Sequence, residues 1–392
     1  MQSLLLDRQL GKVSCKNFER TSTEALYYNL EAQEYPKFST KKKTVGSINA
    51  LDFDKINHRF LLSGGADSSI KIFKVGQVKA DIIGDLNKSN GGHEYGVTDV
   101  KWWPFDMGMF LSSSYDSELK VWDTNTMDEA FSFNLNSKVH CFDISETGDH
   151  SLIASGADSS HVRILDLKTT SAVHSLTGHN GGITSVKWSP NNPNELATGS
   201  SEGEVRIWDI RRTDSCLVQL DLYRTDESAP ISSNDSKKVG VLKSSVKAHA
   251  RAVNGLSWFP SGKSLITTGN DEKIRVWDLE PIGAVNTLLN FGPFVRNKFP
   301  SYKTILLSPI SETELQYLWY PSDNGEILVF RIIDGKLVAR LRKNLQENSR
   351  SCCLTYSGNN SATYFSGTVD GKINIWGPKD ERIIEEDEDD FF

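Results

Sequence analysis

Histidines followed at a near-constant interval by a carboxylate are the residues of this chain whose spacing suggests chemistry. A histidine beside a carboxylate can transfer protons as a general acid or base. The same pair also occurs as a buried structural linkage, because both nitrogens of a buried imidazole need hydrogen-bond partners. We favour the linkage, with a strand Ser or Thr and an indole N–H completing it. The pairs are His93 with Asp116, His179 with Glu202, and His249 with Asp271.

Other catalytic and metal-binding patterns fail on spacing. The triplet Gly262-Lys263-Ser264 lacks the glycine that a phosphate-binding loop needs five residues earlier, because that residue is Ser257. The five cysteines form no CxxC pair, and the chain has no HExxH or GxSxG motif. We therefore expect no metal, no cofactor and no catalysis by this chain itself.

The charge distribution argues against a protein that coats nucleic acid. The 392 residues carry a net charge of -7, and six consecutive acids at 385–390 account for most of it. The rest of the chain is nearly neutral, so we expect no sequence-specific nucleic-acid binding. No apolar run approaches the ~20 residues that cross a bilayer, and no membrane insertion is expected. The acidic run is either a solvated tail or a docking segment for a basic partner.

Eight of the nine tryptophans follow two alternating patterns. In the first pattern a tryptophan stands two residues before a proline, as in VKWWP and VKWSP. In the second it closes an alternating run, as in LKVWD, VRIWD and IRVWD. The second tryptophan follows the first by 20, 20 and 19 residues in three units. The first set is Trp102, Trp188, Trp258 and Trp319, and the second is Trp122, Trp208, Trp277 and Trp376.

Counting weaker copies gives seven units with a period of ~40 to 45 residues plus insertions. A small sheet cannot bury both faces alone, whereas radially stacked sheets bury each face on the next. The sequence therefore predicts an all-β fold, a seven-bladed β-propeller. The third strand of each blade is expected to end near residues 73, 122, 165, 208, 277, 330 and 376, with an insertion at 222–247.

The two ends of the chain complete this organisation. The seventh unit lacks an outer strand, and the alternating segment 24–31 (EALYYNLE) is predicted to supply it. We expect a helical segment at 1–23, a ring-closing strand and linker at 24–43, the propeller at 44–378 and an acidic tail at 379–392. Leucines 4, 5, 6 and 10 form an apolar helical face, which either packs on the propeller or meets a partner.

The GH and WD pairs, with the period between them, resemble the WD-repeat family over about residues 44–377. Two longer stretches, GSINALDFDKINHRFLLSGGADSSIKIF (46–73) and GMFLSSSYDSELKVWDTNT (108–126), resemble the Cockayne syndrome group A family. That resemblance implies a substrate receptor of a cullin-RING ubiquitin ligase. It also implies a nuclear protein that acts in transcription-coupled nucleotide excision repair at stalled RNA polymerase II.

The same resemblance implies partners and docking residues. The partners are the ligase adaptor (the damaged-DNA-binding protein subunit), a Cockayne syndrome group B-like repair ATPase and the RNA polymerase II elongation complex. Adaptor docking falls on Leu5, Arg8 and Gln9 of the N-terminal segment, which Gly11 follows, and on a WDxR box, Trp208, Asp209 and Arg211. Two alternatives stay open: a ligase-independent scaffold in transcription, repair or chromatin assemblies, and a propeller enzyme.

Overall fold

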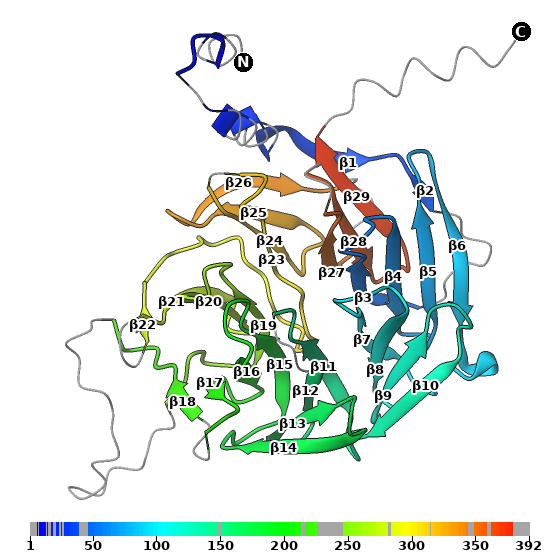
Figure 1. Ribbon diagram of the computed structural model, residues 1–392. Helices are drawn as coiled ribbons and strands as arrows, with labels where there is room; N and C mark the ends of the chain where they lie inside the picture. Colours follow the sequence, from blue (N-terminus) through cyan, green and yellow to red (C-terminus); the bar gives the residue numbers. More distant parts are fainter. Residues whose placement is uncertain are drawn as a thin grey trace, which may run out of the picture.

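The computed structural model describes most of the chain. The described residues are 6, 8–12, 14, 17–18, 21–22, 25, 27–38, 46–147, 151–212, 216–225, 246–280, 284–313, 315–343, 349–358 and 362–378. The acidic tail, Leu5 and most of the 222–247 insertion lie outside them. Seven sheets stand around a common centre, and consecutive sheets are neighbours (Figure 1). The predicted all-β, seven-bladed propeller is confirmed.

In each blade four strands form an antiparallel sheet whose first strand lies nearest the centre (Figure 1). Blade 1 contains β3 (Ile48–Phe53), β4 (Phe60–Gly65), β5 (Ile70–Val75) and β6 (Lys79–Leu86), followed by the 3-10 helix η2 (Lys88–Asn90). Blade 2 contains β7 (Val97–Trp102), β8 (Met109–Ser114), β9 (Glu118–Asp123) and β10 (Glu129–Asn134). Blade 3 contains β11 (Val139–Ile144), β12 (Leu152–Ala157), β13 (His161–Asp166) and β14 (Ser171–Thr177).

The remaining blades follow the same plan. Blade 4 contains β15 (Ile183–Trp188), β16 (Glu195–Ser200), β17 (Val205–Asp209) and β18 (Cys216–Gln219). Blade 5 contains β19 (Val253–Trp258), β20 (Ser264–Gly269), β21 (Lys273–Asp278) and β22 (Val285–Asn286). Blade 6 contains β23 (Leu306–Leu307), β24 (Tyr317–Pro321), β25 (Ile327–Arg331) and β26 (Lys336–Leu341). Blade 7 contains β27 (Ser351–Tyr356), β28 (Tyr364–Thr368) and β29 (Ile373–Pro378).

The hydrophobic core is divided into seven clusters, and each cluster lies between two neighbouring blades. The cluster between blades 1 and 2, for example, joins Ile72 of β5 to Trp102 and Trp122 of blade 2. The repeated tryptophans fill these interfaces, and Trp122, Trp208 and Trp277 are at most 1% exposed. No blade has a separate core, so the aromatic period is a consequence of stacking one sheet on the next.

Ring closure comes from the N-terminal side of the chain, but the strand begins six residues later and ends two residues later than the segment 24–31 that the sequence suggested. The outer strand of blade 7 is β1 (Leu30–Gln33), which pairs antiparallel with β29. The 3-10 helix η1 (Tyr27–Asn29) precedes it, so the strand predicted over 24–31 is wrong at 27–29, while Glu24 and Leu26 lie outside the described residues. The three-residue turn of a 3-10 helix instead places Tyr27 and Leu30 inside and leaves Tyr28 55% exposed.

After β1 the chain continues to the neighbouring blade. The two-residue strand β2 (Lys37–Phe38) pairs in parallel with β6, which makes blade 1 a five-stranded sheet. The N-terminal chain therefore contacts both blades that meet at the closure of the ring. None of the helices among the described residues is long and apolar enough to cross a bilayer.

Candidate docking surface and blade linkages

Two of the predicted histidine pairs adopt the same hydrogen-bonded arrangement. In blade 2, His93 Nδ1 lies 2.8 Å from Asp116 Oδ2 and Nε2 lies 2.7 Å from Ser112 Oγ. The Trp122 indole N–H donates to the same hydroxyl at 2.8 Å. Blade 5 repeats this with His249 Nδ1 2.9 Å from Asp271 Oδ1 and Nε2 2.7 Å from Thr267 Oγ1. Each linkage ties the entry loop of a blade to its second and third strands.

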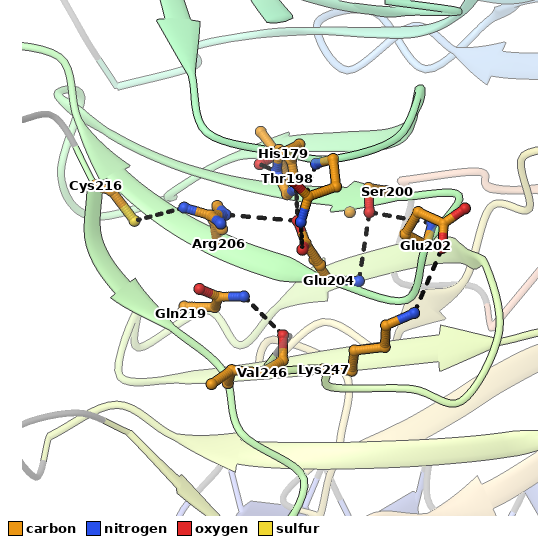
Figure 2. A network of polar contacts seen from close by, with 12 residues as sticks. His179, Thr198, Ser200, Glu202, Glu204, Arg206, Cys216, Gln219, Val246 and Lys247 are labelled. Atoms are coloured by element: carbon orange, nitrogen blue, oxygen red, sulfur yellow. Dashed lines mark hydrogen bonds and ion pairs between the residues drawn. The ribbon is translucent and has the colours of Figure 1, made fainter. Parts of the chain in front are cut away.

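In blade 4 the prediction that Glu202 faces His179 is wrong. His179 Nδ1 lies 3.2 Å from Glu204 Oε2, whereas Glu202 reaches outward to Lys247 Nζ at 3.4 Å (Figure 2). Glu202 occupies the tip of the turn, where blades 2 and 5 have the shorter aspartate. Glu204 directly precedes β17, and its longer side chain faces the imidazole from there. Thr198 Oγ1 completes the linkage at 2.7 Å from His179 Nε2.

The hydrogen-bond directions fix the protonation of these histidines. In blades 2 and 4 the tryptophan N–H donates to the hydroxyl oxygen, so the hydroxyl hydrogen is available to the imidazole Nε2, and Nδ1–H donates to the carboxylate. Burial lowers the pKa of His179 and of His249, and the neighbouring carboxylates only partly offset it. Burial also pushes the pKa of Asp116 upward, but the hydrogen bonds from His93 and the backbone lower it overall. His179 and His249 are therefore neutral imidazoles beside ionised carboxylates.

These linkages offer little to a substrate or a metal. His93 and His249 have no exposed surface, and both ring nitrogens of each are already bonded within the blade. Among the described residues, His93, Asp116 and Glu118 bring possible metal ligands within 4.8 Å of one another. Glu118, however, pairs with Lys120 at 3.4 Å. The arrangement holds turns in place, as expected of a structural element.

The WDxR box places one arginine in a fixed position at the end of β17. Asp209 is 7% exposed, and it accepts two side-chain hydrogen bonds from Arg211, Nε to Oδ1 at 3.1 Å and Nη2 to Oδ2 at 2.9 Å. The Arg211 hydrogen bond lowers the pKa of Asp209, so the pair stays charged. The Arg211 side chain is nevertheless 62% exposed, so its remaining N–H groups face solvent.

Trp208 belongs to the interior, which corrects its place among the docking residues. The indole is 0% exposed and donates its N–H to Thr198 Oγ1 at 2.7 Å. A partner cannot touch a side chain with no accessible surface, so only Asp209 and Arg211 of the predicted box are positioned for contact.

Comparison with known proteins identifies the repeat. Residues 84–123, 170–209 and 240–278 match the sequence profile described as WD domain, G-beta repeat. These are the three segments that hold the histidine linkages of blades 2, 4 and 5. The chain is a WD-repeat protein.

Similarity to one WD-repeat relative extends along nearly the whole chain. The WD repeat-containing protein ATCSA-1 of Arabidopsis thaliana is 29% identical, with 98% of each chain covered. Radiation-sensitive protein 28 of Saccharomyces cerevisiae is 27% identical over 69% of this chain and 56% of its own. Nuclear distribution protein PAC1 of Komagataella phaffii is 28% identical over 70% of this chain and 59% of its own.

The N-terminal segment of this WD-repeat protein presents an apolar face to solvent. Arg8 and Gln9 are helical and exposed, and the Leu10 N–H donates to the Leu6 carbonyl at 2.9 Å. Gly11, with a φ of +70°, ends the turn in the left-handed conformation. Leu6 and Leu10 lie on one side and are 56% and 59% exposed, so they do not pack on the propeller.

The two predicted docking elements lie on different parts of the ring. The N-terminal segment leads into β1 of blade 7, whereas Arg211 follows β17 of blade 4 (Figure 1). The N-terminal segment and Arg211 therefore do not form one compact site. A partner that contacts both must span several blades of one face.

A buried charged cluster near the centre was not predicted from the sequence. Lys101 of blade 2 and Lys187 of blade 4 both pair with Asp143 of blade 3, the second at 3.2 Å. Burial favours a raised pKa for Asp143, but the two lysines lower it overall. Nearby Asp99 differs, because its burial raises the pKa to about 6 and the lysines offset this only in part. The available signal was the lysine before the tryptophan in VKWWP and VKWSP.

Proposed function

We propose that this protein is the substrate-recognition subunit of a cullin-RING ubiquitin ligase, acting in transcription-coupled nucleotide excision repair at stalled RNA polymerase II in the nucleus. The similarity to ATCSA-1, which covers 98% of both chains, is the observation that carries the proposal. Two stretches that resemble the Cockayne syndrome group A family agree with it. The name of the yeast relative, radiation-sensitive protein 28, is consistent with a role in DNA damage.

Docking on the ligase adaptor is proposed at Arg211 and the exposed leucines. Asp209 orients the Arg211 guanidinium before binding, so little side-chain entropy is lost when a partner carbonyl or carboxylate accepts its free N–H groups. Leu6 and Leu10 would add apolar contact area, because a one-sided helix turn fits a groove on a partner. Arg8 and Gln9 flank them and supply polar contacts.

The propeller itself would act as a platform and not as an enzyme. By binding a target and the adaptor at once, it raises the effective concentration of target lysines at the ligase. The repair ATPase and the polymerase are proposed partners of the opposite face. The described histidines of blades 2, 4 and 5 are committed to structural hydrogen bonds, which leaves them unsuited to proton transfer.

Affinity capture with the purified adaptor from the same organism tests the proposal. Deletion of residues 1–20 is expected to abolish capture, and Asp209→Ala with Arg211→Ala to weaken it at least tenfold. Arg340→Ala is a matched control, because Arg340 also forms a two-point bond with a buried acid, Glu326. Glu326 precedes its strand whereas Asp209 ends its own, so the control lies on the opposite face.

The outcomes separate the candidate functions. Capture that depends on the N-terminal segment and on Arg211, but not on Arg340, would support the receptor. Folded wild-type protein that does not bind the adaptor would contradict it and would leave a ligase-independent scaffold in transcription, repair or chromatin assemblies.

A further inference from the structure

A groove lies between blade 7 and blade 1, where the N-terminal chain crosses. Its volume is about 380 Å³, and its lining comes from β1 to β6 and β29 with their adjoining turns. The floor is apolar. It contains Phe38, Ile48, Phe73, Ile82, Ile373 and Ile375.

The polar part of the groove is dominated by lysines. Lys37, Lys343 and Lys372 are exposed along it, and Lys71 lies deeper. Among the described lining residues, two carboxylates, Glu34 and Asp67, oppose them. The Asp67 carboxylate already accepts the Ser69 hydroxyl at 2.6 Å. The groove therefore combines an apolar floor with a surplus of positive charge.

Lys71 is the unusual residue of this set. It is 8% exposed, so most of its side chain is buried against the groove. A cation that has lost part of its water gains from a nearby anion or from hydrogen-bond acceptors. The groove thus places a largely buried lysine beside an apolar floor, which is the complement of an acidic ligand with an apolar group.

We propose that the occupant is the chain's own segment 385–392, EEDEDDFF. Six acids would face the groove lysines, and Phe391 and Phe392 would fill the apolar floor. This is an interaction within one molecule, and it does not depend on the ligase proposal. It assigns the acidic run a specific binding site instead of a purely solvating role.

The geometry of the chain permits this contact. The described part of blade 7 ends at Pro378, on β29, the strand that also supplies Ile373 and Ile375 to the groove. Five residues of strand separate Ile373 from Pro378, which corresponds to about 17 Å. The seven residues from 378 to 385 can span up to about 25 Å, so the acids can reach the groove. A short tether also gives an effective concentration in the millimolar range, so a weak contact would still be populated.

Zero-length carbodiimide cross-linking of the full-length protein, read by mass spectrometry, tests the proposal. This reagent joins an amine to a carboxylate only when the two groups touch. We expect the acids at 385–390 to link to Lys37, Lys343 or Lys372 at least tenfold more than to Lys138, an exposed lysine of blade 3. Phe391→Ser with Phe392→Ser keeps every charge and should reduce the groove links at least fivefold. Equal yields at the groove and at Lys138 would overturn the proposal.

A labelled peptide of residues 383–392 separates the tail from an external occupant. The peptide should bind the Phe391→Ser, Phe392→Ser protein at least tenfold more tightly than the wild type, whose groove is already filled. Lys71→Met should reduce that binding, and added salt should weaken it. Equal binding to both proteins would show an open groove for an acidic partner and would overturn the tail as occupant.

Discussion

The carboxylate that faces His179 belongs to Glu204, whose Oε2 lies 3.2 Å from the imidazole Nδ1. Glu202, two residues earlier, reaches into solvent toward Lys247 instead (Figure 2). A buried imidazole that loses its acceptor is left with an unsatisfied N–H, whereas an exposed ion pair contributes little. The two glutamates of one turn therefore have very different energetic weights.

Substitution of these glutamates should show the difference. Glu204→Gln is expected to lower the free energy of unfolding by about 2 kcal/mol, the usual scale for a buried hydrogen bond to a charged group. Glu202→Gln should change it by less than about 0.5 kcal/mol. Chemical denaturation followed by tryptophan fluorescence measures both. Equal losses for the two variants would contradict the assignment of Glu204 to the linkage.

The buried histidines should contribute less to the stability of the protein as pH falls below neutral. Burial holds the pKa of His179 and His249 below the ordinary value of 6.5, so in that range the unfolded chain binds more protons than the folded one. The stability that these histidines contribute is full above pH 6.5 and is lost as pH falls below it. Melting temperatures at pH 7.5 and 5.5 should show the loss. His249→Gln should reduce the difference between the two temperatures, whereas His161→Gln, at an exposed position, should not.

Asp99 should destabilise the protein at neutral pH. Its folded pKa, about 6, lies above the ordinary 3.8, so ionising it costs more in the folded state. The protonated Asp99 carboxyl therefore contributes its full stability below pH 3.8, and this contribution is lost as pH rises through 6. Asp99→Asn should raise the melting temperature by a few degrees at pH 7.5 and by much less at pH 4.5. A lower melting temperature at pH 7.5 would show instead that Lys101 and Lys187 need the charge.

Tyr27 should be essential to ring closure. Its ring stacks on Tyr317 at 4.7 Å between centroids, and its hydroxyl lies 2.7 Å from the Tyr364 hydroxyl. Tyr27→Ala is expected to cost about 3 to 5 kcal/mol, as for other buried aromatic residues. Tyr28→Ala, at a side chain 55% exposed, is the matched control and should cost less than about 1 kcal/mol. Deletion of residues 1–31 should lower the melting temperature at least as much as Tyr27→Ala.

Much of the fold was accessible from the sequence because its determinants recur locally. Blades 2, 4 and 5 each contain a tryptophan, a turn and a second tryptophan, and weaker copies of this unit recur with a period of about 45 residues. Radial stacking is the arrangement that buries both faces of such sheets. The partners of His93 and His249 could also be predicted from the sequence. Each is an aspartate in the turn of the same blade, and its short side chain reaches the imidazole only from that turn.

The tertiary structure decided what depends on contacts between blades or on the exact conformation of a turn. Glu204, directly before β17, faces the imidazole in place of Glu202, because Glu202 at the turn tip points outward to Lys247. The pairing of Gln33 with Ile375, and the groove beside it, exist only after the ring closes and brings the two ends of the chain together. The ion pairs of Asp143 likewise require lysines from two other blades, which only the closed ring brings together. A local repeat specifies the blade, but closure determines which side chains meet between blades.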